Sequence, residues 1–208
     1  MDLIALFEQC SPQVAPTTMQ RIIFVESHGN PNVIGYKITK KGKVYTLTKQ
    51  PENKEQAVAW ATWLYSNNYR FDAGIAQVNS QNFASFNVTP ESIFDPCVNV
   101  RVGGQILTQF YQSAQKQYKN EQKALLAAVS AYNSGNFSTG FKNGYVSKFI
   151  HHSFSFPMIN YAWNQPPLKA IPQSVIDKNK VVLERKVVNK EELNPYTASS
   201  EVEAFKNI

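Results

Sequence analysis

The chain has few cysteines and histidines, and none of them is spaced as metal ligands are. Its 208 residues include 2 cysteines, Cys10 and Cys97, and 3 histidines, without a CxxC or HxxxH pattern. Because a structural zinc site needs four ligands, we expect neither a metal site nor a cofactor. The cysteines leave two interpretations: one disulfide in an oxidising compartment, or two separate buried thiols in a cytosolic protein.

Long apolar runs are also missing. No stretch of about 18 uninterrupted apolar residues occurs, so we expect no membrane-spanning helix and do not expect an integral membrane protein. The first ten residues, MDLIALFEQC, carry neither the basic nor the long apolar region of a secretory signal. Two interpretations remain, a mature form of a secreted protein or a protein that stays inside the cell.

The excess of positive charge is modest, with a net charge of +6 and a pI of about 9.2. Such a charge favours an acidic partner, but it does not by itself indicate nucleic acid. Six lysines lie between Lys37 and Lys54, which makes this the most basic part of the chain. We interpret them as a surface for anionic glycan or a partner protein, and we expect no nucleic-acid binding.

The apolar spacing predicts a mainly α domain, and 43% of the residues are hydrophobic, enough for one core. A β-hairpin is predicted within residues 34–49, around the turn KKGK, and a loop and turn over 71–83. From residue 165 the chain is rich in proline and charge, so we divide it into a domain, 1–164, and a flexible extension, 165–208. Helices are predicted over 2–9, 16–27, 98–118 and 121–135, and within 51–68 after the cap Asn53.

Glu26 stands on the apolar face of the predicted helix 16–27, where another apolar side chain would be expected. Burial and the negative end of the helix dipole both favour the neutral acid, which predicts a raised pKa for Glu26. A glutamic acid with a pKa of about 6 can act as a general acid at neutral pH. The alternative is a glutamate at the core's edge that reaches solvent or pairs with a lysine. Steps of three or four residues define this face: Ala15, Met19, Ile22, Ile23 and Glu26.

Three later motifs carry polar or aromatic side chains suited to a sugar site. GIAQVNS opens at Gly74 and presents two side-chain amides, Gln77 and Asn79, of the kind that bind sugar hydroxyls and N-acetyl groups. SAYNSGN places Tyr132 next to an asparagine at a helix end, and NGYV adds another tyrosine. Each motif alone is weak, since aromatic residues at helix ends usually pack in the core.

Together, in this order, the motifs resemble those of the soluble lytic transglycosylases with a goose-lysozyme-like catalytic domain. The members that serve type IV secretion and conjugation systems are the most similar, and they share a cysteine before the catalytic helix and a DPC turn, here Asp95 to Cys97. The resemblance covers about residues 8–150. It rests on four matches: ES..NP with ESHGNP from Glu26, GLMQIN with GIAQVN from Gly74, AYNxG with AYNSG from Ala131, and GYV with Tyr145.

The resemblance implies a mechanism in which one carboxyl acts twice. Glu26 protonates the oxygen between N-acetylmuramic acid and N-acetylglucosamine, and the substrate's N-acetyl carbonyl helps stabilise the cationic centre. Glu26 then takes the proton of the sugar's primary hydroxyl, and a 1,6-anhydro sugar forms without water. The roles implied for the other site residues are these: Ser27 orients the carboxyl, Gln77 and Asn79 hold the N-acetyl groups, Tyr145 and Asn133 hydrogen-bond Glu26 or the developing charge, and Tyr132 forms the floor.

The resemblance also implies a lysozyme-like fold, a Cys10–Cys97 disulfide and a periplasmic location. The expected partners are the glycan strands of peptidoglycan and, through the tail, secretion-system proteins. In the GIAQVN loop the family usually has methionine where this chain has Ala76, so we expect one wall of the sugar site to be roomier.

Two other functions stay open at this point. A lysozyme-type hydrolase would need a second carboxylate to position water, and the nearest candidates are Asp72 and Asp95. We interpret Asp72 as a turn residue and Asp95 as a helix cap. The other alternative is a non-catalytic peptidoglycan-binding or assembly module, in which Glu26 would have no chemical role.

Overall fold

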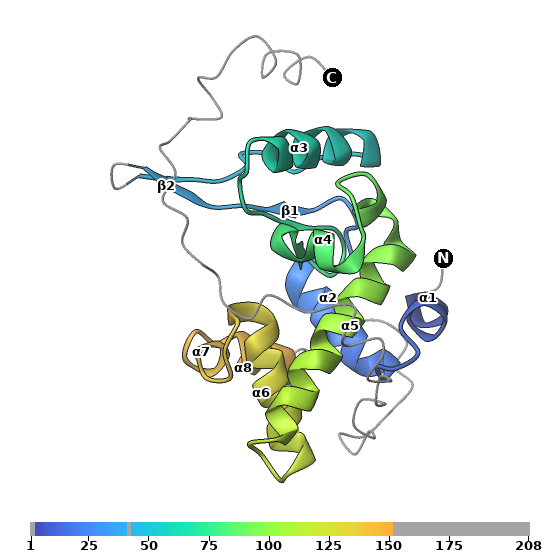
Figure 1. Ribbon diagram of the computed structural model, residues 1–208, viewed down its shortest axis with the longest axis vertical. Coiled ribbons are helices and arrows are strands. Elements are labelled where there is room, and N and C mark those ends of the chain that lie inside the picture. The colour runs from blue at the N-terminus through green and yellow to red at the C-terminus, as the bar shows by residue number, and fades with distance from the viewer. Residues whose placement is uncertain (1–2, 41–42, 152–208) are drawn as a thin grey trace.

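A computed structural model of the protein describes residues 3–40 and 43–151 (Figure 1). The predicted extension, residues 165–208, lies outside the described residues, so the domain division stays a prediction. The described helices are α1 (Leu3–Cys10), α2 (Pro16–Ser27), α3 (Lys54–Ser66), α4 (Phe83–Phe86), α5 (Pro96–Gln115), α6 (Glu121–Ser134), α7 (Thr139–Lys142) and α8 (Tyr145–His151), with 3-10 turns at η1 (Ser80–Asn82) and η2 (Ser92–Phe94). The strands are β1 (Ile34–Gly35), β2 (Ile38–Lys40), β3 (Lys43–Tyr45), β4 (Asp72–Ala73) and β5 (Val78–Asn79).

The helix ends follow local capping rules, which explains why the predicted helices are found close to their expected bounds. Pro16 is the first residue of α2, where its missing N–H costs nothing and its fixed φ suits a helix. The Asn53 side chain accepts a hydrogen bond from the backbone N–H of Gln56 (2.9 Å) and so caps α3. Gly135, with φ of 77°, ends α6 in the left-handed conformation. The mainly α fold is confirmed.

The predicted hairpin is present, and the structure also contains a three-stranded sheet that was not predicted. Strands β2 and β3 pair antiparallel, with Ile38 opposite Tyr45. Residues 71–83, however, are not only a loop and turn, because β4 and β5 pair within them and β4 also pairs with β1. Each of these strands is two residues long, too short to show the alternation that identifies a strand in a sequence. Asp72 is therefore a strand residue, opposite Asn79, and its interpretation as a turn residue is wrong.

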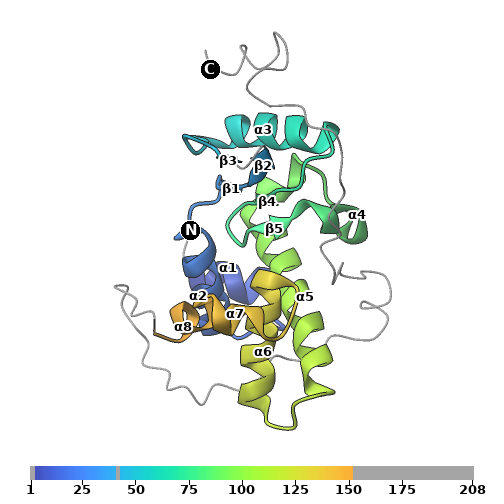
Figure 2. The same ribbon diagram turned by 90° about the vertical axis from the view of Figure 1, so that its left-hand side faces the viewer.

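Helix α5 passes through the middle of the molecule. Figures 1 and 2 show α3 and the strands towards one end of it and α6, α7 and α8 towards the other. Helices α1 and α6 pack directly on α5, and the interior is filled by large apolar side chains. Fully buried aromatic residues include Phe7, Phe71, Phe83, Phe94, Tyr111 and Phe149.

A disulfide joins α1 to the start of α5. It links Cys10, the last residue of α1, to Cys97, with 5.2 Å between the two Cα atoms. Of the two interpretations of the cysteines, the disulfide is confirmed. The chain just after α1 also lies close to α5, since a Cβ added to Gly104 would come within 1.9 Å of the Ser11 hydroxyl oxygen.

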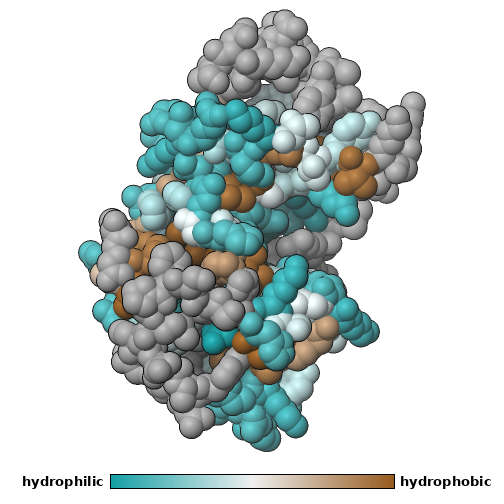
Figure 3. All heavy atoms as spheres, turned by 180° about the vertical axis from the view of Figure 1, so that it is seen from behind, coloured by the Kyte–Doolittle hydropathy of each residue, from teal (hydrophilic) through white to brown (hydrophobic). Residues whose placement is uncertain are grey.

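The surface of the described residues is mostly polar. On the face shown in Figure 3, hydrophilic residues cover both ends of the described part, and apolar ones gather between them. Large hydrophobic side chains that stand well exposed are Val44, Tyr65 and Phe141. Among the described residues, no helix combines the length and apolar character needed to cross a bilayer.

Candidate active site

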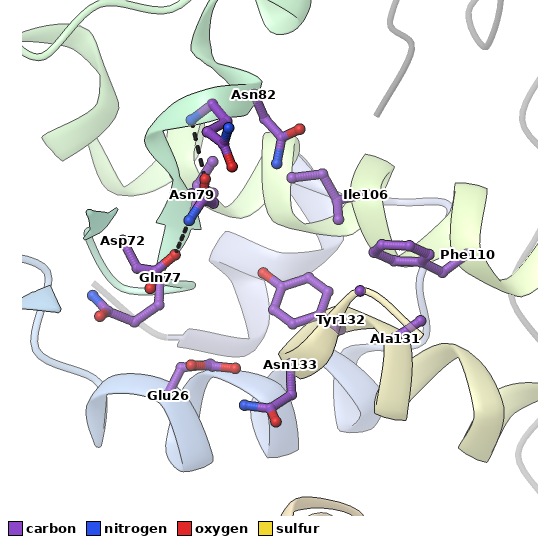
Figure 4. A pocket seen from close by; sticks show the side chains of 13 residues that line it. Glu26, Asp72, Gln77, Asn79, Asn82, Ile106, Phe110, Ala131, Tyr132 and Asn133 are labelled. Carbon is purple, nitrogen blue, oxygen red and sulfur yellow. Dashed lines mark hydrogen bonds between the residues drawn. The ribbon is translucent and has the colours of Figure 1, made fainter. Parts of the chain in front are cut away.

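A cleft of about 150 Å³ lies between the β4–β5 hairpin on one side and helices α2 and α6 on the other, and Glu26 lines it. Glu26 and Asn133 stand along one side, and Asn79 and Asn82 along the other (Figure 4). The lining comes from α2, the β4–β5 hairpin, α5 and α6, so it is assembled from distant parts of the chain. The lining residues are Glu26, Asp72, Gln77, Val78, Asn79, Gln81, Asn82, Ile106, Phe110, Ala131, Tyr132, Asn133 and Gly135.

The carboxyl of Glu26 is held by Tyr145. Glu26 is the last residue but one of α2 and is half-buried, whereas Tyr145, the first residue of α8, is buried. The Tyr145 hydroxyl donates a hydrogen bond to Oε1 of Glu26. Burial raises the pKa of Tyr145 well above its ordinary value, and the charge of Glu26 and this hydrogen bond raise it further. Tyr145 therefore stays a neutral donor, and one of the two contacts expected for it is present.

Three helices hold the loop Gly74–Gln77 at the edge of the cleft. From α2, the Ser27 hydroxyl donates to the carbonyl of Ile75 (2.6 Å), and from α6, the Tyr132 hydroxyl donates to that of Ala76 (2.7 Å). The buried Asn99 of α5 accepts from the Ala76 N–H (2.7 Å) and donates to the carbonyl of Ala73 in β4, just before the loop (2.9 Å). Buried backbone groups need such partners, so these side chains determine the shape of the loop.

Gly74 is required by this arrangement in two ways. Its φ is +78°, which disfavours any residue with a side chain. A Cβ at this position would also lie 2.2 Å from Nδ2 of Asn99. Glycine at position 74 thus lets the Asn99 side chain reach the backbone of the loop. This contact explains the glycine more specifically than the opening of a loop does.

Ser27 does not have the place expected from the resemblance. It is buried and is not among the lining residues. Its hydroxyl contacts the carbonyl oxygens of Ile75 and Ile23, at 2.6 and 3.2 Å. Ser27 was expected to orient the Glu26 carboxyl; its hydroxyl instead joins the end of α2 to the loop, and any effect on the carboxyl stays a prediction.

Gln77 and Asn79 line the cleft, but their amide groups also bind the protein. Nε2 of Gln77 donates to the carbonyls of Val33 (2.9 Å) and Gly74 (2.8 Å). Nδ2 of Asn79 donates to Oδ1 of Asp72 (2.8 Å) across the β4–β5 pair. Both amides therefore stabilise the loop and hairpin, and their contact with N-acetyl groups stays a prediction.

Tyr132 and Asn133 come from the end of α6. Tyr132 lines the cleft beside Glu26, and burial raises its pKa well above the ordinary value, with further contributions from the charges of Glu26 and Asp72. Oδ1 of Asn133 accepts a hydrogen bond from Nδ2 of Asn143 (2.9 Å). This bond ties α6 to the segment that precedes Tyr145.

Asp72 belongs to the site, although the sequence favoured a turn for it. It lines the same cleft as Glu26. Asp95 does not, and it caps α5 as predicted, because its Oδ1 accepts from the N–H of Val98 (2.9 Å). Ile106 and Phe110 of α5 also line the cleft. The helical period gave no signal for this role, because apolar residues in the core and in the wall of a cleft follow the same period.

Ala76 does not widen the cleft. It is fully buried and absent from the lining residues. Its methyl group faces α5, where a Cβ added to Gly103 would come within 2.8 Å of it. The roomier wall expected from this departure is therefore not found at this position.

A helical domain built on a central helix, with a small antiparallel sheet and a glutamate at a helix end in the cleft, is a lysozyme-like arrangement. Residues 4–154 match the family described as "Transglycosylase SLT domain", and the chain belongs to this family.

Two curated relatives show which branch of the family is similar. The chain is 40% identical over 153 residues to "Type IV secretion system protein virB1" of Brucella abortus, and 34% identical over 140 residues to "Protein virB1" of Agrobacterium fabrum. These matches cover 71% and 67% of this chain, but only 62% and 54% of the relatives' own lengths. No solved structure gives a significant match.

Proposed function

We propose that the protein is a lytic transglycosylase that cleaves the β-1,4 bond between N-acetylmuramic acid and N-acetylglucosamine in peptidoglycan and leaves a 1,6-anhydro end. The observation that carries the proposal is that Glu26 lines the cleft while the buried Tyr145 donates a hydrogen bond to one of its carboxyl oxygens. Membership in the transglycosylase family supports it.

The geometry suits a carboxyl that first gives up a proton. Because Tyr145 donates to Oε1, that oxygen acts as the acceptor, and the acidic proton of neutral Glu26 resides on Oε2. Oε2–H protonates the glycosidic oxygen, the bond to the anomeric carbon breaks, and the N-acetyl carbonyl of the substrate stabilises the cationic centre. The hydrogen bond from Tyr145 stabilises the carboxylate that results.

The same carboxylate then acts as a base. It takes the proton of the sugar's primary hydroxyl as that oxygen bonds to the anomeric carbon, so Glu26 returns to its neutral form and no water is consumed. The attacking hydroxyl is part of the bound sugar, and its effective molarity can reach ~10⁵ M or more. An intramolecular attack can therefore outcompete water without a second carboxylate.

The lining of the cleft fits a sugar polymer. Sugars present hydroxyl and N-acetyl groups around an apolar ring face, and the cleft offers amides beside apolar surface. Its volume is below the roughly 300 Å³ of a pocket for a drug-sized ligand, so it holds only a short part of a strand. The expected contacts come from Gln77, Asn79 and Asn133, with Tyr132 as the floor and Phe110 as apolar surface.

We further propose that the protein acts in the periplasm and opens the cell wall for a type IV secretion or conjugation apparatus. The similarity to two proteins named virB1, one of them a type IV secretion system protein, supports this setting. Secretion-system partners would bind through residues 165–208, which carry none of the catalytic motifs.

One observation favours a second candidate, a lysozyme-type hydrolase. Asp72 lines the same cleft as Glu26, and a hydrolase uses a second carboxylate to activate water or to bond the sugar. Against this role, Oδ1 of Asp72 is engaged by Asn79. The product distinguishes the two enzymes, since only the hydrolase adds water.

The test is digestion of purified peptidoglycan followed by mass analysis of the released fragments. We expect fragments that end in 1,6-anhydro-N-acetylmuramic acid, each lighter by one water than the hydrolase product and resistant to borohydride reduction. Mainly reducing ends would support the hydrolase, and Asp72→Asn would then be the next variant. If no fragments are released, the protein is a binding or assembly module and the proposal fails.

A further inference from the structure

Arg21 connects the helix of Glu26 to the helix of Tyr145. It lies on α2, five residues before Glu26, and is half-buried. Its Nη1 donates hydrogen bonds to the backbone carbonyls of Phe149 (2.9 Å) and Ile150 (2.8 Å). Both carbonyls belong to the last turn of α8, the helix that begins with Tyr145. Helices α2 and α8 are thus joined at two places, by Arg21 and by the hydrogen bond from Tyr145 to Glu26.

The two joints are matched in spacing. Along α2, the five residues from Arg21 to Glu26 rise about 7.5 Å, and along α8, the four or five residues from Tyr145 to the bonded carbonyls rise about 6–7.5 Å. Arg21 meets the end of α8, and Glu26 meets its beginning. Helices α2 and α8 therefore run antiparallel. Arg21 binds the last turn of α8, and Glu26 accepts the hydrogen bond from the hydroxyl of Tyr145 at its first residue.

The contact at Arg21 is a favourable one for a helix end. The last four carbonyls of a helix have no partner within it and carry partial negative charge. A guanidinium there satisfies two of them at once, and charge-assisted hydrogen bonds are stronger than neutral ones. Burial lowers the pKa of Arg21 from its ordinary value, but arginine stays charged because that value is so high.

We propose that Arg21 is a positioning residue for the proposed catalytic carboxyl. By holding the last turn of α8 on α2, it sets the position of Tyr145 and, through the Tyr145 hydroxyl, the orientation of Glu26. Helix α8 has only seven residues, and a helix this short is not stable without packing. The buried side chains of Val146 and Phe149 anchor its apolar face, while Arg21 determines where its axis lies along α2.

This inference rests on the proposed function, because the orientation of Glu26 matters only if Glu26 does chemistry. A positioning role of Arg21 differs from a purely structural one in its dependence on Tyr145. If Arg21 acts through Tyr145, its removal has no further effect on turnover once the Tyr145 hydroxyl is gone. A residue that only stabilises the fold would lower turnover by the same factor in both backgrounds.

The experiment is a double-mutant cycle of Arg21→Met and Tyr145→Phe, with kcat and KM measured on solubilised glycan strands. Lys148→Met is the matched control, since Lys148 is an exposed cation in the last turn of α8. We expect Arg21→Met to lower kcat by roughly 5-fold to 100-fold, the range that a displacement of up to about 1 Å can cause. KM should change by less than about twofold, and the control should match the wild type.

In the Tyr145→Phe background, Arg21→Met should change kcat by less than about twofold. Equal losses in both backgrounds, or wild-type kcat in Arg21→Met, would overturn the proposal. Arg21→Lys should recover part of the loss, because an ammonium can also donate to both carbonyls. If Arg21→Met fails to fold, the same cycle is measured with Arg21→Gln, whose shorter side chain does not span the distance to the α8 carbonyls, and the same outcomes decide.

Amide hydrogen exchange gives a readout that does not depend on cleavage. Residues of α8 should exchange faster in Arg21→Met than in Lys148→Met, because the last turn of α8 is released. Unchanged exchange in α8 would overturn the proposal even if activity fell. If the wild-type protein cleaves no glycan, the proposed function fails, whereas the exchange result still shows whether Arg21 holds α8.

Discussion

The hydroxyl of Tyr145 donates a hydrogen bond to Oε1 of Glu26, although 119 residues separate them in the chain. The bond joins the first residue of α8, which is buried, to the end of α2, where Glu26 lines the cleft. In this bond Oε1 of Glu26 is the acceptor.

Replacing Tyr145 with phenylalanine should lower kcat by about 10-fold to 100-fold. A hydrogen bond to a charged group contributes about 1.5–3 kcal/mol, and each ~1.4 kcal/mol of lost stabilisation is a factor of ten in rate. Turnover of solubilised glycan strands checks this, with Tyr118→Phe as the control because the Tyr118 ring packs on Phe137 and is not part of the cleft lining. Wild-type turnover in Tyr145→Phe would show that the bond has no catalytic role.

Glu26→Gln should fold normally and lose at least the ~10²–10⁴-fold attributed to general acid–base catalysis. The amide keeps the shape of the side chain and can accept the hydrogen bond from Tyr145, but it cannot donate and recover a proton. Glu8→Gln, on the exposed surface of α1, should behave as wild type. Activity above about a tenth of wild type in Glu26→Gln would place the acid elsewhere, with Asp72 examined first.

Gly74→Ala should destabilise the protein more than Gly29→Ala does. Both glycines have positive φ, +78° and +82°, so both substitutions carry a backbone cost of about 1 kcal/mol. Only at Gly74 does the new Cβ meet another group, Asn99 at 2.2 Å, whereas nothing lies within 4 Å at Gly29. Thermal melting measures the difference, at about 2–4 °C for each kcal/mol. Equal melting temperatures would contradict the tight contact at Gly74.

Removal of the disulfide should lower the melting temperature by on the order of 10 °C. The bridge between Cys10 and Cys97 spans 87 positions, and the chain-entropy model assigns on the order of 4 kcal/mol to a loop of that size. Melting of the Cys10→Ser, Cys97→Ser double variant tests this. Intact-mass measurement with and without reductant should show a difference of two hydrogen atoms in the native protein, and two free thiols would contradict both the bridge and the periplasmic location.

Deleting residues 165–208 should leave cleavage of isolated peptidoglycan nearly unchanged. The segment contains no catalytic motif, and its composition is unsuited to a core of its own. Any loss should instead appear in binding of secretion-system proteins or in secretion by cells. If the shortened protein unfolds or loses cleavage, the boundary at residue 164 is misplaced.

The sequence by itself determined the features that depend on neighbours along the chain. Pro16, Asn53 and Gly135 mark helix ends because caps act within one turn, and the helical period placed Glu26 on the apolar face of its helix. The motif order was specific enough to indicate the family. The β2–β3 pairing was also predictable, since only two residues separate the strands in the sequence.

Only the tertiary structure decided which side chains meet in the cleft. Asp72 was interpreted as a turn residue because a two-residue strand shows no period, and its place beside Glu26 depends on pairing with β1 and β5. Ser27 was expected at the carboxyl but bonds the loop instead, and Arg21 gave no signal at all. Such contacts join residues far apart in the sequence, and no local pattern encodes them, because they arise from how the helices pack around α5.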